Sequence, residues 1–148
     1  SVDGVDEHKK WKGDIETFAG AEAGFPIIAD SDLTVAKAFD MLPADAYLPD
    51  GRTPNDSATV RAVFIIGPDK QLKLSMTYPM TVGRNFAEVL RALDGLQTST
   101  GKGVATPANW NVGDDVIIPA TLSDDDAKAK FGDFNKILPY LRTTKAPS

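Results

Sequence analysis

Two neighbouring segments predict a β-hairpin, and this pairing constrains the fold more than any other feature of the chain. Residues 60–66 are almost continuously apolar and β-branched, interrupted only by Arg61, which is typical of a strand covered on both faces. A turn sequence follows at residues 67–70, and apolar residues then alternate with polar ones over residues 72–77, which is the period of a strand. Two strands joined by so short a turn pair antiparallel.

Helical periodicity surrounds the hairpin. Apolar residues at three-and-four spacing predict a first helix capped by Asp3 and ended by Gly20, and a second helix capped by Ser31 or Asp32. A third, strongly amphipathic helix is predicted from about residue 82 to residue 97. The apolar run at residues 25–29 predicts a buried strand, whereas residues 43–58 have only loop chemistry. This alternation of helices and strands predicts an α/β sheet domain.

The character of the sequence changes after residue 97. Residues 98–103 are polar and contain two glycines, which predicts a flexible linker. Further on, we expect a short strand within residues 114–119, a helix over 124–131 capped by Ser123, and a final edge strand at 140–144. This tail has too little apolar material for a core of its own, so it should pack on the main domain or on a partner subunit. The predicted domains are therefore residues 1–97 and 98–148.

Composition excludes several classes of site. The 148 residues include no cysteine and a single histidine, His8, which rules out disulfides, thiolate zinc sites, redox cysteine pairs and multi-histidine metal sites. No cofactor is expected. A net charge of −5 gives no electrostatic case for binding nucleic acid. No apolar run approaches the length of a membrane span and no signal-peptide pattern is present, so we expect a cytoplasmic protein.

Two arginines are the candidate site residues. A guanidinium within an apolar strand, as at Arg61, costs several kcal/mol unless it meets an anion or a dense set of acceptors. The strand pattern alone is equally consistent with an arginine on an exposed face. Arg84 lies at the start of the predicted third helix, where a positive charge opposes the helix dipole. Either a specific anionic partner or a simple surface position would explain an arginine there.

Other residues have simpler interpretations. His8 lies on the apolar face of the first predicted helix, where a lone histidine usually serves packing. Asp69 belongs to the hairpin turn, which explains an aspartate without any function. Trp11 and Trp110 are interpreted as core or interface anchors.

Four segments carry a family resemblance: residues 58–70, residues 72–79, Gly83-Arg84-Asn85-Phe86, and residues 104–110. In this order they resemble the second half of a one-cysteine peroxiredoxin of the peroxiredoxin 6-like group. The similarity runs along essentially the whole chain and is loosest at residues 44–57. It implies a thioredoxin-like sheet with flanking helices, incomplete at its N-terminus, and a small appended C-terminal domain involved in dimer packing. The upstream third of the family fold, which carries the peroxidatic cysteine, is lacking.

The resemblance implies part of a thiol-dependent peroxidase that reduces hydrogen peroxide and organic hydroperoxides. In such enzymes the thiolate attacks the O–O bond, becomes a sulfenic acid, and is regenerated by an external thiol reductant. The arginine matching Arg61 lies beside the cysteine and stabilises its thiolate, and the arginine matching Arg84 lies close to the same pocket. Some members are also credited with a phospholipase activity, for which Asp69 occupies the position of the acidic residue. The edge strand from Gln71 to Tyr78 is expected to form a homodimer.

These expectations leave alternatives open. Central parallel strands need neighbours on both sides, so the 148 residues should not fold stably alone, and should associate with their own upstream segment. The isolated chain should be inactive, since the nucleophile is missing. A cysteine-free interaction or scaffold module derived from the same fold is the alternative. A hydrolase built on His8 and Asp69 is the third hypothesis.

Overall fold

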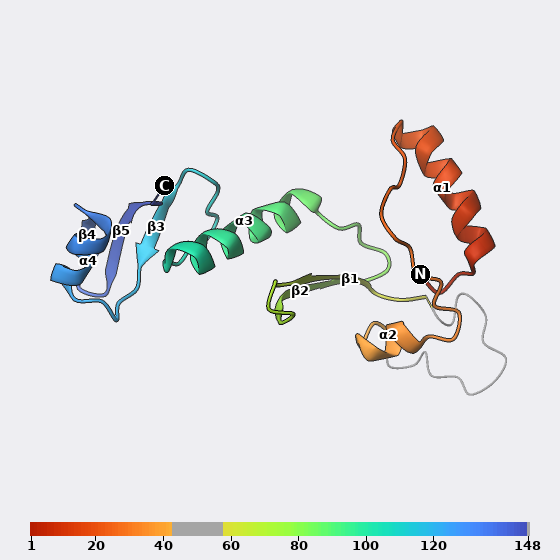
Figure 1. Ribbon diagram of the computed structural model, residues 1–148, viewed down its shortest axis with the longest axis horizontal. Coiled ribbons are helices and arrows are strands. Elements are labelled where there is room, and N and C mark those ends of the chain that lie inside the picture. Colours follow the sequence, from red (N-terminus) through yellow and green to blue (C-terminus); the bar gives the residue numbers. More distant parts are fainter. Residues whose placement is uncertain (43–57, 148) are drawn as a thin grey trace. The chain divides into compact units, whose positions relative to one another are not determined.

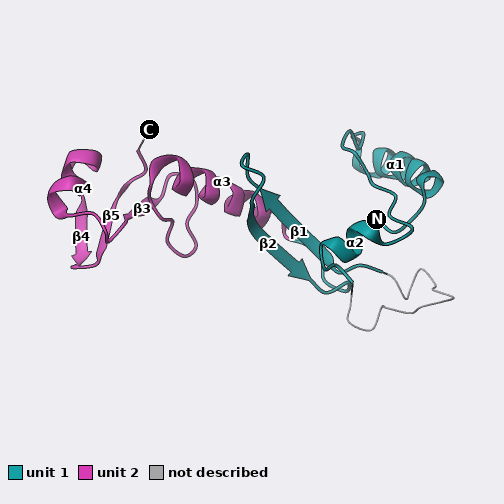
Figure 2. Ribbon diagram, turned by 60° about the horizontal axis from the view of Figure 1, so that its bottom comes forward, with its two compact units in different colours: residues 1–84 teal, residues 85–148 magenta. Residues whose placement is uncertain are grey.

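The computed structural model describes residues 1–42 and 58–147, and Figure 1 labels its elements. The chain forms two compact units, residues 1–84 and 85–148 (Figure 2). The loop expected at residues 43–58 falls almost entirely outside the described residues, and the boundary expected after residue 97 stays a prediction. Within the described ranges, every helix is too short or too polar to cross a membrane.

Helix α1, Val5–Ala19, opens the first unit. Its N-cap is Gly4, which makes no side-chain capping bond, so the prediction that Asp3 caps this helix is wrong. Instead, the carboxylates of Asp6 and Glu7 lie in the first turn, where they stabilise the helix by interacting with the positive end of its dipole. The helix ends at Gly20 as predicted, because this residue takes the left-handed conformation (φ 68°) and donates its N–H to the Glu16 carbonyl at 2.9 Å.

Helix α2, Thr34–Ala38, is short and is held mainly by a residue that the sequence did not single out. The carboxylate of Asp30 accepts from the backbone N–H groups of Val35 at 2.8 Å and Ala36 at 2.7 Å. The N-cap is Leu33, so the prediction of Ser31 or Asp32 as the cap is wrong. Asp32 accepts from the first helix residue, Thr34, through N–H at 3.1 Å and Oγ1 at 2.8 Å. These hydrogen bonds, the Thr34 hydroxyl first, hold the pKa of the Asp32 carboxyl below its usual value.

The apolar run at residues 25–29 is not a strand, which corrects the prediction. Its only backbone pairing among the described residues is with the first residue of the chain, whose amino group donates to the Ile28 carbonyl at 3.1 Å. Phe25 and Ile28 are both more than half exposed. Apolar composition alone does not make a strand when no partner strand lies beside it.

The predicted hairpin is confirmed. Strands β1, Arg61–Ile66, and β2, Leu72–Tyr78, pair antiparallel, with Val63 opposite Met76. Among the described residues they form a two-stranded sheet, so the outer edge of each strand has no partner there. The side chains of β1 are half-buried or exposed, which differs from the cover expected on both faces.

The second unit begins with helix α3, Phe86–Lys102, capped by Asn85, whose side chain accepts from the Glu88 N–H at 3.3 Å. The helix therefore starts later than predicted and runs through residues 98–102, where we expected a flexible linker. Ser99 stays compatible with the helix because its hydroxyl donates to the Leu96 carbonyl at 3.1 Å. The helix ends at Gly103 (φ 64°).

A three-stranded antiparallel sheet follows, formed by β3, Asp115–Ile118, β4, Asn135–Leu138, and β5, Leu141–Lys145, in the order β3-β5-β4. Helix α4, Asp124–Phe131, is capped by Ser123 as predicted. No pattern in residues 135–138 indicates strand β4. Because β4 pairs with one side of β5, the last strand is central, and its prediction as an edge strand is wrong.

This unit has a core, contrary to the expectation for the tail. Trp110 packs with Val104 and Val116, and Val116 and Ile118 are completely inaccessible to solvent. The Trp110 indole also donates to the Asp114 carbonyl at 3.2 Å. The Trp110 ring also lies against Gly95 of helix α3, at ordinary contact distance from where a β-carbon would stand, so this helix covers part of the core.

Candidate functional site

Arg61 is the first residue of β1, opposite Tyr78 of β2. Its side chain is exposed, and its Nε donates to the main-chain carbonyl of Met80 at 2.7 Å. No carboxylate pairs with this guanidinium within the described residues. Among the described residues, the guanidinium thus has a neutral acceptor and no carboxylate that would neutralise its charge.

Arg84 lies in the connection that leads from β2 to α3, immediately before the cap residue Asn85. It is exposed. The same connection contains Met80, the partner of Arg61. The hairpin and this connection therefore carry both predicted arginines in the first unit.

The geometry does not support a site made from His8 and Asp69. His8 is 7% exposed on α1, and its Nε2 has no hydrogen-bond partner in the part of the chain that the structure describes. Asp69 is occupied in the hairpin turn, where it accepts from the Lys73 ammonium at 2.5 Å and from the Gln71 N–H at 3.2 Å. The Lys73 hydrogen bond, followed by that of Gln71, lowers the pKa of the Asp69 carboxyl. These are properties of a packing histidine and a turn aspartate.

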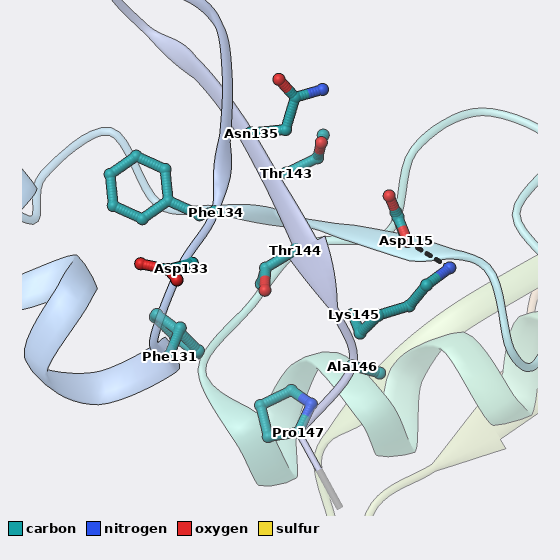
Figure 3. A pocket seen from close by; sticks show the side chains of 10 residues that line it. All are labelled: Asp115, Phe131, Asp133, Phe134, Asn135, Thr143, Thr144, Lys145, Ala146 and Pro147. Atoms are coloured by element: carbon teal, nitrogen blue, oxygen red, sulfur yellow. Dashed lines mark ion pairs between the residues drawn. The ribbon is translucent and has the colours of Figure 1, made fainter.

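The second unit contains an open hollow of about 660 Å³ (Figure 3). Its wall is formed by the end of β5 and by the connection from α4 to β4, with the aromatic side chains of Phe131 and Phe134. The ammonium of Lys145 lies 2.6 Å from Asp115, and this carboxylate raises the pKa of Lys145. The hollow offers no thiol or imidazole, and its one lysine is paired, so it provides no nucleophile for the chemistry expected of this chain.

Arg142, near the hollow, has a different role from Arg61. It is 2% exposed and donates to Asp124 at 2.9 Å and to the carbonyls of Pro119 and Leu122 at 2.8 Å. Its guanidinium also lies 5.7 Å from the ring centre of Phe134. These contacts bind the start of α4 to β5, so this arginine is structural.

The contact that sequence reasoning missed is the one between Arg61 and Met80. It involves a main-chain carbonyl, which every residue type carries, so no side-chain pattern could have revealed it. The one available signal is the position of residues 79–82 directly after a strand that pairs with β1.

Two family models match the chain. The model of the AhpC/TSA family matches residues 1–75, and the model of the C-terminal domain of 1-Cys peroxiredoxin matches residues 95–133.

Curated relatives match nearly the whole chain. Peroxiredoxin PRX1, mitochondrial, of Saccharomyces cerevisiae is 50% identical over 149 residues, which cover 99% of this chain and 56% of the relative. Peroxiredoxin-6 of Gallus gallus is 46% identical over 157 residues, which cover 99% of this chain and 68% of the relative. The chain thus spans little more than half to two thirds of the length of these relatives.

Solved structures agree with the fold. A structure of a yeast mitochondrial 1-Cys peroxiredoxin has a TM-score of 0.88 and 51% identity, covering 98% of this chain and 68% of that one. A cysteine-to-serine mutant of Peroxiredoxin 6 of Arenicola marina has a TM-score of 0.86 and 42% identity, covering 99% and 68%. The predicted α/β fold class, that of a peroxiredoxin, is confirmed.

Proposed function

The chain belongs to the AhpC/TSA family, among its one-cysteine peroxiredoxins, and from this premise we propose that the full-length protein is a thiol-dependent peroxidase. Its substrates are hydrogen peroxide and organic hydroperoxides. The peroxidatic cysteine comes from the segment upstream of Ser1, because none of the 148 residues is a cysteine. Its thiolate attacks the O–O bond, water or an alcohol leaves, and the cysteine becomes a sulfenic acid.

The observation that carries this proposal is the state of Arg61. Its guanidinium stands at the start of an otherwise apolar strand, exposed, and anchored only through Nε within the described residues. A cation with free donors beside a thiol lowers the thiol pKa and stabilises negative charge as the O–O bond breaks. Arg61 therefore acts on the thiolate and the peroxide, and Arg84, carried by the following connection, adds positive charge to the same pocket.

The upstream segment is the first partner of this chain. The first unit exposes large apolar side chains on α1, after it and on the hairpin, among them Trp11, Phe18, Phe25, Ile28 and Leu72. Such an amount of exposed apolar surface is typical of an interface. The upstream strands of the family fold cover this surface and bring the cysteine to Arg61.

A second copy of the protein is the second partner. The outer edge of β2 is unpaired among the described residues, and an exposed strand edge of this length is a template for pairing. The Gln71–Tyr78 edge joins two subunits into a homodimer with a continuous sheet. An external thiol reductant returns the sulfenic acid to the thiol.

The proposed compartment is the cytoplasm, although the yeast relative is named as mitochondrial. A fluorescent fusion of the full-length protein tests this location.

Peroxide consumption tests the proposed activity. The full-length protein, supplied with a thiol reductant, should consume hydrogen peroxide and an organic hydroperoxide, whereas residues 1–148 alone should consume neither. Intact-mass spectrometry of both samples establishes which segment each contains. Peroxide turnover by the isolated chain would contradict the proposal, because no side chain in it supports this chemistry. An inactive full-length protein with a normal thiol pKa would favour the non-catalytic scaffold.

A further inference from the structure

The Arg61 guanidinium is oriented by one hydrogen bond. Its Nε donates to the Met80 carbonyl at 2.7 Å, and no second hydrogen-bond partner lies within residues 1–42 and 58–147. A guanidinium is planar and has five N–H groups in a fixed arrangement. One bond at Nε therefore fixes the direction of the two terminal nitrogens, Nη1 and Nη2.

The acceptor is itself held in place. The N–H of Val82 donates to the Pro79 carbonyl at 3.0 Å, which closes a turn over residues 79–82 directly after β2. Pro79 has a fixed φ and reduces the freedom of this turn. Tyr78 is the register partner of Arg61, and the turn begins at the next residue. The pairing of β1 with β2 therefore places this turn next to Arg61.

We infer that the Met80 carbonyl is a positioning group that aims the Arg61 guanidinium at the reacting atoms. The bond at Nε leaves the edge formed by Nη1 and Nη2 free to make a two-point contact with the thiolate and the bound peroxide. A lysine could supply the charge but could not make both contacts at once. This inference rests on the proposed peroxidase function and adds a residue to its site.

The turn has a second consequence for the site. Residues 80–84 begin with Met80, whose carbonyl accepts from Arg61, and end with Arg84. One short segment therefore orients Arg61 and contains Arg84. A change that displaces the turn alters both arginines together.

The test replaces the amide between Met80 and Thr81 by an ester in the full-length protein, using the α-hydroxy acid analogue of threonine. An ester carbonyl is a weaker acceptor, and the Thr81 N–H that is lost makes no backbone hydrogen bond within the described residues. The pKa of the peroxidatic thiol, measured from the pH dependence of its alkylation, should rise. The kcat/KM for hydrogen peroxide should fall about tenfold, as expected when a hydrogen bond to a charged group is weakened.

A double-mutant cycle separates positioning from general damage. In an Arg61→Lys background the same ester should leave the thiol pKa unchanged, because there is no guanidinium to aim. An ester between Val112 and Gly113, in an exposed loop of the second unit, serves as the control and should change neither quantity. An equal effect of the Met80 ester in both backgrounds, or none in either, overturns the inference. If Arg61→Ala, which removes the charge, leaves the thiol pKa unaltered, the proposed role of Arg61 fails and not only its positioning.

Discussion

Two arginines in strand positions show how the surroundings of a residue decide its role. Arg142 is almost completely buried, and its two terminal nitrogens donate to one carboxylate and two carbonyls. Arg61 is exposed and has one neutral acceptor among the described residues. A buried guanidinium whose terminal nitrogens are hydrogen-bonded to several elements holds structure together, whereas we propose that the charge of Arg61 serves a ligand. The two residues thus form a matched pair for mutagenesis.

We predict opposite effects for the two alanine variants of the full-length protein. Arg61→Ala should lower kcat/KM for peroxide about 100-fold, which is typical of losing one group that stabilises developing negative charge, and should leave the melting temperature nearly unchanged. Arg142→Ala should lower the melting temperature by several degrees, because it removes the donor to the Pro119 and Leu122 carbonyls and one donor to the Asp124 carboxylate, and should retain activity at low temperature. Steady-state kinetics and thermal unfolding measure both. Equal losses of activity and stability in both variants would contradict this assignment.

Trp110 tests the core of the second unit. It is 2% exposed and contacts Val104 and Val116, so Trp110→Ala should lower the free energy of unfolding by about 3–5 kcal/mol, as large-to-small changes in a core do. Val112→Ala, in the same loop but 74% exposed, should change it by less than about 0.5 kcal/mol. Urea unfolding measures both values. A cost below about 1 kcal/mol for Trp110→Ala would mean that this cluster is not a core.

At the scale of elements, one carboxylate joins three of them. Asp124, the first residue of α4, accepts from Lys136 of β4 at 2.5 Å and from Arg142 of β5 at 2.9 Å. The Lys136 hydrogen bond, with a further contribution from Arg142, lowers the pKa of the Asp124 carboxyl below its ordinary value of 3.8. The same carboxylate lies at the positive end of the helix dipole.

This network predicts a loss of stability in acid. Because the pKa of Asp124 is lower in the folded protein than in the unfolded chain, the contribution is complete above the ordinary value of 3.8 and disappears as the pH falls through the lowered folded pKa. Asp124→Asn should therefore lower the melting temperature at pH 7 and flatten its dependence on pH below about 4. Asp125→Asn, one residue along the same helix turn, is the control. The idea fails if both variants have the same pH profile.

The outer edge of β2, unpaired among the described residues, predicts which substitution should weaken a homodimer. The strand runs from Leu72 to Tyr78, so a symmetric antiparallel pairing centred on it places Ser75 opposite Ser75 of the second copy. Ser75→Asp should promote dissociation because two carboxylates then face each other across the pair, and added salt should partly restore the dimer. Ser75→Asn, of similar shape without the charge, should stay dimeric. Sedimentation velocity decides, and an unchanged dimer in the Asp variant would place the interface elsewhere.

At the scale of the whole molecule, the two units differ in how much of their apolar surface they cover by themselves. The second unit has completely buried residues in Val116 and Ile118, whereas Phe18, at the end of α1 in the first unit, is 95% exposed. The isolated chain should bind the dye ANS strongly, and the full-length protein should bind it weakly, because the upstream segment covers the first unit. Equal fluorescence of the two samples at equal concentration would contradict the proposed association. Cooperative unfolding of a monomeric isolated chain would do so as well.

The sequence predicted the elements whose patterns are local. The hairpin, the end of α1 at Gly20 and the Ser123 cap all depend on a few neighbouring residues, and each is confirmed. The errors arose where distant partners decide. Residues 25–29 looked like a strand but have no strand beside them in the part of the chain that the structure describes. Residues 98–102 looked like a linker but continue α3, whose Gly95 lies against Trp110.

The candidate site divides in the same way. Arg61 stood out because a charge interrupts an apolar run, which is visible in any single sequence. The Met80 carbonyl that accepts from Arg61 could not be predicted, because every residue type has a backbone carbonyl. The central position of β5 in its sheet could not be predicted either. Its second neighbour, β4, consists of four exposed residues without the apolar alternation that predicts a strand.

The strand order β3-β5-β4 also has a meaning for biosynthesis. The central strand of this sheet is the last of the three to be synthesised, so β3 and β4 emerge from the ribosome before the strand that joins them. Until residues 141–145 have emerged, β4 lacks its partner strand and β3 has only its bridge to Ala105 among the described residues, so the second unit remains incomplete. Translational pausing or premature termination late in the message would therefore release a chain with an unfinished sheet, an expected target for chaperones and proteases.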